Sequence, residues 1–244
     1  MRTKLLKRKT LAALLTLCMV ITLLPFTVFA AAPATETADF TVGRGEAAVK
    51  LLNQYKTGTA DSLWDNNTKT LTLWGVNFTT TAQTAVKLPA GATIVLTDGS
   101  YNFFQSGDVA LNASGQHKNQ IFINALDAAG SLTVQGETAG TGTLSVYAGK
   151  VTNEGDAWTF SSGISVYGDF TVKGGHVTAR GGHVEGKDSV FSIGVNMDNN
   201  IKNKALLVTG GTLSAIAGES YEIQDDGSKR AMFSRGVYMF QGNV

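Results

Sequence analysis

Short segments in which apolar and polar residues alternate are the main pattern of this chain. Three of them fall close together, at residues 164–166, 170–172 and 177–179, and each has two apolar ends around a hydroxyl residue. Alternation with a period of two predicts strands that bury one face. The dipeptides Gly168-Asp169 and Gly174-Gly175 separate the segments and favour turns, because glycine adopts positive φ at little steric cost.

The segments recur at a nearly fixed spacing. LLVTGGTLSAIAG (206–218) copies FTVKGGHVTARGG (170–182) at a distance of 36 residues. LTVQGETAGTGTLSVYAG (132–149) contains the same two strands, and aligning Val134 with Val172 gives a distance of 38 residues. The sequences GISVYGDF, GVNMDNN and GVYMFQGNV repeat a leading strand. Repetition at such a period predicts a repeat architecture.

The repeats predict an all-β fold, specifically a right-handed parallel β-helix from about residue 70 onward. Nearly every apolar run after residue 78 has three to five residues and is bounded by Gly, Asn or Asp, which leaves no room for helices. Three strands and three turns would form one coil. An antiparallel sandwich is the alternative, but it requires longer strands. Outward hydroxyl side chains suit strands stacked about 4.8 Å apart, and the candidates are Thr133, Ser145, Ser165, Thr171, Thr178 and Ser214.

The chain divides into a leader and one domain. Residues 1–30 have a cationic head, an apolar run and a small-x-small site, which are typical of a signal peptide. A retained membrane anchor is the alternative, because the apolar run is nearly long enough to span a bilayer. Residues 31–44 form a flexible leader, and residues 45–244 form the β-helix domain, with an N-terminal cap at 45–78 and repeats at 79–244.

Two further expectations concern the ends of this domain. Residues 45–56 have one apolar face, which predicts a short capping helix over the first coil. The last repeat stops at Val244, part way through its second strand, so we expect the domain to be truncated there and the sequence to be the N-terminal portion of a longer protein.

Removal of the signal peptide changes the charge balance. The sequence has 20 basic and 19 acidic residues, and five of the basic ones but none of the acidic ones precede residue 31. The mature chain is therefore mildly acidic, and we expect it to bind neither nucleic acid nor, after cleavage, a membrane. The single cysteine, Cys18, is lost with the peptide, so no disulfide stabilises the chain.

Three groups of residues have counterparts in a known family. They are Trp64-Asp65 followed by Thr70-Leu71-Thr72-Leu73, then Leu88-Pro89 followed by Gly91, Thr93, Ile94 and Leu96, and finally the Gly-Ile/Val…Phe/Leu-x-Val-x-Gly-Gly repeats. In these the chain resembles secreted Gram-positive β-helix proteins described as carbohydrate-binding domain-containing, over about residues 60–244. The resemblance implies binding of a plant-type polysaccharide such as polygalacturonate, with calcium held in acidic turns.

No catalytic motif is recognisable. β-Helices of the pectinase kind use paired Asp carboxylates for glycoside hydrolysis, or an Arg or Lys base with a calcium-binding carboxylate cluster for elimination. In the repeats the acidic residues stand singly, and no motif pairs them with Arg180. We therefore expect no enzymatic activity, with a polysaccharide lyase or a glycoside hydrolase of the β-helix class as the alternative.

Basic and aromatic side chains are the candidate carbohydrate-binding groups. Five basic residues lie within a segment whose one acidic residue is Glu185, and they form a local positive stripe on an acidic chain: Lys173, His176, Arg180, His183 and Lys187. Aromatic rings pack on the C–H faces of sugars, each well-buried contact stabilising by about 1 kcal/mol, and the candidates are Tyr147, Trp158 and Tyr167.

Acidic residues in turns are the candidate calcium ligands, namely Asp156, Asp169 and Asp198. Extracellular modules commonly bind calcium in the ~0.1 to 1 mM range, so we expect at most a modest contribution from it.

The sequence therefore predicts a secreted, adhesin-like module that binds polysaccharide, either a plant-type or a cell-wall glycan, without cleaving it. A passive stalk for a further C-terminal domain is another alternative. We expect the protein to be associated with the Gram-positive cell surface through the region that follows Val244.

Overall fold

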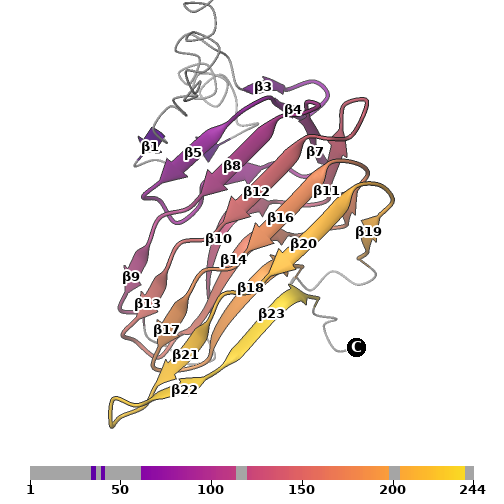
Figure 1. Ribbon diagram of the computed structural model, residues 1–244. Coiled ribbons are helices and arrows are strands. Elements are labelled where there is room, and N and C mark those ends of the chain that lie inside the picture. Colours follow the sequence, from indigo (N-terminus) through magenta and orange to yellow (C-terminus); the bar gives the residue numbers. More distant parts are fainter. Residues whose placement is uncertain (1–33, 37–39, 42–61, 114–119, 198–203, 240–244) are drawn as a thin grey trace, which may run out of the picture. The chain divides into compact units, whose positions relative to one another are not determined.

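The computed structural model describes residues 34–36, 40–41, 62–113, 120–197 and 204–239, all of which belong to one compact unit at 34–244. Within these ranges the regular structure consists of strands, without a helix, as the sequence predicts for an all-β fold (Figure 1). The predicted signal peptide and capping helix lie outside the described residues.

The strands form four sheets, named A to D here. Sheet A has the order β1-β5-β8-β12-β16-β20. Its strands are β1 (Ala34–Glu36), β5 (Asn77–Thr80), β8 (Tyr101–Gln105), β12 (Thr143–Tyr147), β16 (His176–Arg180) and β20 (Thr212–Ile216). Sheet B has the order β2-β6-β10-β14-β18-β23. Its strands are β2 (Phe40–Thr41), β6 (Val86–Leu88), β10 (Gln120–Ala128), β14 (Trp158–Val166), β18 (Val190–Asn196) and β23 (Phe233–Tyr238).

The other two sheets each end in one antiparallel strand. Sheet C has the order β19-β15-β11-β7-β4-β3. Its strands are β3 (Ser62–Asp65), β4 (Thr70–Leu73), β7 (Ala92–Leu96), β11 (Leu132–Gly136), β15 (Phe170–Val172) and β19 (Leu206–Val208). Sheet D has the order β22-β21-β17-β13-β9. Its strands are β9 (Val109–Leu111), β13 (Val151–Asn153), β17 (Val184–Gly186), β21 (Ser220–Ile223) and β22 (Lys229–Ala231). Only β3–β4 and β21–β22 pair in antiparallel fashion among the described strands.

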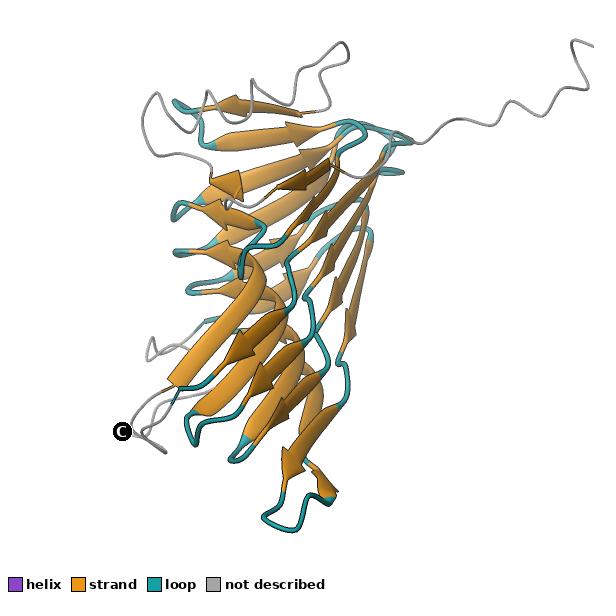
Figure 2. Cartoon of the chain, turned by 90° about the vertical axis from the view of Figure 1, so that its left-hand side faces the viewer, coloured by secondary structure: helices purple, strands orange, loops and turns teal. Residues whose placement is uncertain are grey.

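From β7 onward the chain visits the sheets in the order C, A, D, B and then begins again (Figure 1). Figure 2 shows the strands of successive passes stacked side by side. One pass therefore contains four strands, and the predicted three strands per coil are wrong. The extra strand belongs to sheet D, where β9, β13 and β17 have only three residues each. In β13 (VTN) and β17 (VEG) the second buried position is Asn153 or Gly186 rather than an apolar residue, so the apolar–polar–apolar signal is absent from the sequence.

The strand register confirms the repeat alignment. Val134 pairs with Val172, and Phe170 pairs with Leu206, at the predicted distances of 38 and 36 residues. The leading strands also stack, because Ile164 pairs with Val195 and Val195 with Val237. Columns of equivalent side chains thus run across each sheet from one pass to the next.

The hydroxyl residues follow these columns with one exception. Thr133 stacks on Thr171, and Thr178 stacks on Ser214, with partly exposed side chains as predicted. Ser165 is buried instead, next to Asp127 of the neighbouring strand. Burial raises the pKa of Asp127, and the bonds from Asn124 and Ser165 oppose that rise.

Apolar side chains form two separate buried clusters. The larger cluster lies among sheets A, B and C and includes Leu126, Ile164 and Val195 from the second halves of the sheet B strands. The smaller cluster lies between sheet D and the first halves of the same strands, and includes Ile123 and Val151. The sheet B strands are longer than the sequence pattern indicates, because polar and small residues occupy their middle.

Buried serines occupy this middle section. The hydroxyl of Ser161 accepts the N–H of Gly182 at 3.2 Å. The hydroxyl of Ser192 accepts the N–H of Gly218 at 2.7 Å and donates to the carbonyl of Gly182 at 2.6 Å. Both serines are fully buried, so their bonds satisfy backbone groups that no water reaches. They link sheet B to the corner between sheets A and D.

That corner has the same construction in every pass. It always contains three residues, 106–108, 148–150, 181–183 and 217–219, and the central one is always glycine. A Cβ atom at Gly149, Gly182 or Gly218 would overlap the carbonyl oxygen of the glycine one pass earlier. Successive passes therefore lie backbone against backbone here, and only glycine fits.

The glycine column yields a stability prediction. We expect Gly182→Ala to lower the free energy of unfolding by about 3 kcal/mol or more, since the new methyl group must push apart two rigid backbones. Urea denaturation measures the effect.

Gly227→Ala is the matched control. Gly227 has a φ of +79° in the turn before β22, but a Cβ atom there meets nothing within 4 Å. Its substitution costs only the left-handed backbone strain, about 1–2 kcal/mol. Equal losses in the two variants would contradict a tight corner.

Candidate functional site

A groove of about 450 Å³ lies over the corner between sheets A and D. Its floor includes Gly181 together with Gly182 and Gly218, two of the stacked corner glycines. Polar side chains stand around this floor, and they are Gln105, Tyr147, Arg180, His183 and Glu219. The N–H groups of Gly182 and Gly218 are already bound by Ser161 and Ser192, so the groove presents its side chains to a ligand.

The first wall of the groove comes from the last residues of three sheet A strands. Gln105, Tyr147 and Arg180 end β8, β12 and β16, and they pair in register. The residues before them, Phe104 and Val146 among them, are buried in the larger core. Alternation along a strand then points the last side chains outward, above one another.

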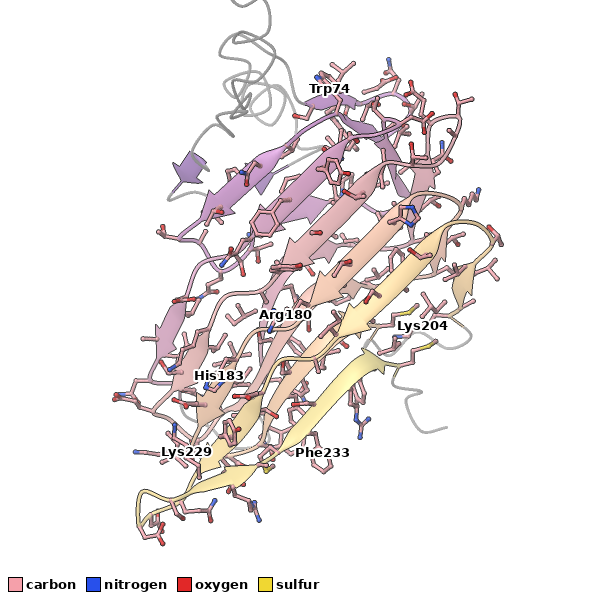
Figure 3. All side chains as sticks on the ribbon, viewed as in Figure 1. Trp74, Arg180, His183, Lys204, Lys229 and Phe233 are labelled. Atoms are coloured by element: carbon pink, nitrogen blue, oxygen red, sulfur yellow. The ribbon has the colours of Figure 1, made fainter. Side chains whose placement is uncertain are left out.

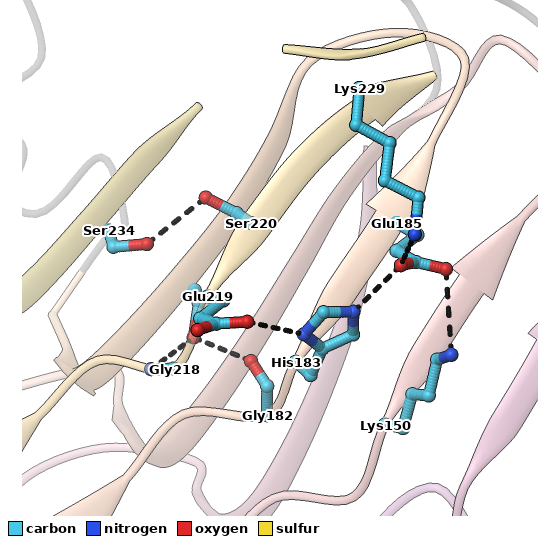
Figure 4. Close-up of polar contacts among 10 residues, drawn as sticks. Lys150, Gly182, His183, Glu185, Gly218, Glu219, Ser220, Lys229 and Ser234 are labelled. Carbon is cyan, nitrogen blue, oxygen red and sulfur yellow. Dashed lines mark hydrogen bonds and ion pairs between the residues drawn. The ribbon is translucent and has the colours of Figure 1, made fainter. Parts of the chain in front are cut away.

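The second wall comes from the residues that follow the glycines. Lys150, His183 and Glu219 follow Gly149, Gly182 and Gly218, and the register of sheet D places them in one column, of which His183 and Glu219 line the groove. His183 lies between two carboxylates, with Nε2 2.9 Å from Glu185 Oε1 and Nδ1 3.5 Å from Glu219 Oε2 (Figure 4). Figure 3 labels Arg180, at the end of β16, and His183, in the corner that follows it.

Glu185 is the most strongly held charge beside the groove. Its side chain is only 12% exposed, and Lys229 Nζ lies 2.5 Å from Oε1 while Lys150 Nζ lies 3.5 Å from Oε2. Hydrogen bonds from Lys229 and His183, helped by the charge of Lys150, lower the pKa of Glu185 to about 2. Glu185 therefore remains ionised, and its carboxylate is bound by Lys150, His183 and Lys229.

The lowered pKa predicts how stability depends on pH. The pKa of Glu185 is lower in the folded state than the ordinary 4.5, so its contribution is complete above about pH 4.5 and is lost as pH falls toward 2. We expect Glu185→Gln to destabilise the protein at pH 7 and to have a much smaller effect near pH 2. Urea denaturation of both proteins across this range measures the difference, and an effect of Glu185→Gln independent of pH would contradict the assignment.

Three of the predicted carbohydrate-binding residues meet in the groove, namely Tyr147, Arg180 and His183. The other basic residues of the predicted stripe lie elsewhere. His176 begins β16, at the far end of that strand from Arg180, and its Nδ1 lies 3.0 Å from Thr212 Oγ1.

Lys173 is exposed in the turn between sheets C and A, and Lys187 is exposed in the turn after β17. The five basic residues thus fall at three different corners of one pass.

The remaining aromatic candidates lie away from the groove-lining residues. Trp158 begins β14, and its ring centroid lies 6.0 Å from that of Phe191. Tyr167 lies in the turn between β14 and β15 and is partly buried.

The predicted calcium ligands are not gathered by the fold. Asp169 is exposed, and its Oδ1 accepts the N–H of Ala205 at 2.8 Å. Asp156 is partly buried in the loop before β14, and Asp198 lies outside the described residues. In the described part of the chain, no group of three or more His, Cys, Asp or Glu side chains is placed to hold a metal ion.

Sequence reasoning missed several members of the site. Gln105, Lys150, Glu219 and Lys229 were not among the candidates, although the first three occupy fixed places in the repeat. Aligning the three-residue corners would have found Lys150 and Glu219, because each follows the glycine just as His183 does. Lys229 had no such signal, since β22 reverses direction and pairs with β21 in antiparallel fashion.

The groove offers binding groups and little catalytic chemistry. An amide and a phenol can donate or accept hydrogen bonds, and a guanidinium can donate them, to a ligand rich in hydroxyl groups. Among the described residues that line the groove, Glu219 is the one carboxylate. Glycoside hydrolysis generally requires two carboxylates on opposite sides of the scissile bond, and Glu185 is bound by two lysines.

Comparisons with known proteins yielded no match. No family model, no curated protein and no solved structure is significantly similar to this chain. Within the described residues, no helix is long and apolar enough to cross a membrane.

Proposed function

We propose that this chain is a secreted or cell-surface module that binds an acidic polysaccharide without cleaving it. The observation that carries the proposal is the meeting of Tyr147, Arg180 and His183 above a floor of glycine. The pattern of residues 1–30 supports export.

The groove chemistry supports a ligand that combines hydroxyl groups with a carboxylate. A guanidinium such as that of Arg180 binds a carboxylate through two parallel hydrogen bonds. The ring of Tyr147 offers an apolar face to sugar C–H groups, while its hydroxyl group remains a hydrogen-bonding group. Gln105 adds an amide that can donate and accept.

Positive groups lie in and beside the groove. Arg180 lines it together with one carboxylate, Glu219, while Lys150 and Lys229 lie beside it and pair with Glu185. Exposed charge contacts are weak, roughly 0.2 to 1 kcal/mol each. Useful affinity therefore requires several contacts along a repeating polymer.

A pull-down assay tests this function. We expect retention on polygalacturonate, but not on neutral xylan or cellulose, and we expect salt to weaken it. Arg180→Ala should lower affinity roughly two- to fivefold, because it removes one exposed charged contact from the groove. Lys173→Ala is the matched control, since it removes the same charge from an exposed turn outside the groove-lining residues.

Three results would count against the proposal. Equal losses in the two variants would favour a diffuse positive stripe over the groove. A salt-independent preference for neutral glycans would exclude the acidic ligand. Release of unsaturated or reducing sugar ends would identify a lyase or a hydrolase. Repeating the assay in EDTA and in millimolar calcium measures the calcium contribution, which we propose to be modest because the acidic turn residues are dispersed.

We propose further that the fold is a right-handed parallel β-helix. The recurring order of sheets C, A, D and B, with parallel pairing between successive passes, supports this class. Right-handed connections are the general rule for parallel strands. A crystal structure with left-handed passes, or with Phe170 and Leu206 in an antiparallel hairpin, would contradict it.

A further inference from the structure

The outer face of sheet A carries aromatic side chains beyond the groove. Tyr101 and Phe103 lie two residues apart on β8, with Asn102 and Phe104 buried on the opposite face. Tyr101 is 79% exposed, the most exposed of the large apolar and aromatic side chains in the described part of the chain. An aromatic ring that buries so little of its surface contributes little to the free energy of folding.

The residues beside these rings are small or polar. Tyr101 pairs in register with Thr143, and Phe103 pairs with Ser145 on one side and Asn77 on the other. The ring of Tyr101 therefore stands above its register neighbours, while Phe103 is partly exposed beside it. A flat ligand could lie against them.

A stack of phenylalanines on sheet B provides the contrast. Phe122, Phe160, Phe191 and Phe233 follow one column with centroid distances of 4.8, 4.5 and 5.9 Å and nearly parallel planes. Each ring there covers the next, which is the arrangement of a structural column. On sheet A the ring of Phe103 meets that of Tyr147 edge to face, at 5.3 Å and 88°.

The Phe103–Tyr147 contact joins the exposed rings to the groove. Tyr147 lines the groove, and its ring is in direct contact with Phe103 on the neighbouring strand. Tyr101 lies four residues before Gln105, a distance of about 13 Å along the strand. A continuous surface thus runs from Tyr101 through Phe103 and Tyr147 to Arg180.

We infer that Tyr101 and Phe103 form an aromatic subsite that binds further sugar units of the polysaccharide chain held in the groove. This inference rests on the proposed function. The ligand at this end is a pyranose unit whose C–H groups pack on a ring, while the groove holds a carboxylate on Arg180. Affinity therefore depends on the length of the oligosaccharide.

Calorimetric titration with oligogalacturonides, from the disaccharide to the octasaccharide, tests this subsite. We expect affinity for the wild-type protein to rise with length until the chain covers both the groove and the rings. Tyr101→Ala should lower affinity for the longest oligosaccharides roughly three- to tenfold and leave the shortest unchanged. Tyr101→Phe should retain the wild-type profile, because it keeps the ring.

The controls separate this inference from the proposed function. Leu207→Ala removes an exposed apolar side chain from sheet C and should change nothing. If Arg180→Ala weakens binding while Tyr101→Ala has the wild-type length profile, the groove is supported and the aromatic subsite is refuted. If the wild-type protein binds no oligosaccharide and no polymer, the proposed function fails and the subsite fails with it. Equal melting temperatures of Tyr101→Ala and wild type exclude a loss through unfolding.

Discussion

The close approach of backbones at the corner between sheets A and D is the constraint on which the rest of the structure depends. Gly149, Gly182 and Gly218 allow successive passes to lie directly on one another. This contact fixes the spacing of the passes, and with it the register of sheets A and D on either side. The hydroxyl groups of Ser161 and Ser192 then bind sheet B to the same corner. Both apolar clusters are arranged around this polar section.

The same corner explains why a groove forms there. Side chains are absent from the floor, so the neighbouring residues rise around it as walls. The partners of Glu185 keep one carboxylate out of the groove and bring two lysines to its edge. The ionic cluster around Glu185 is thereby distinct from Arg180 and Tyr147, although these groups lie only one corner apart. Arg180 and Tyr147 can meet a ligand without weakening the ionic cluster.

The sequence predicted the repeat well because its strongest signal is local. The pattern around Phe170 and Leu206 was enough to align two passes correctly, and the register bears this out. The fourth strand of each pass was not predicted, because strands such as β17 (VEG) have an apolar residue at only one of their two buried positions. Basic and aromatic composition found Arg180, His183 and Tyr147, but it could not separate them from Lys173. That separation depends on which corner each residue occupies, and hence on the number of strands in a pass.

The constant length of the corner has a consequence for how such a protein can change during evolution. The turns between sheets C and A vary from three residues at 173–175 to six at 137–142, whereas the A–D corner always has three. The turn between sheets C and A thus accommodates extra residues, whereas the corner between sheets A and D keeps one length. The residue after each glycine is nevertheless free to differ, and it is Asp108, Lys150, His183 and Glu219 in turn. Each pass can therefore present a different side chain at this corner through a single substitution, while the framework around it stays unchanged.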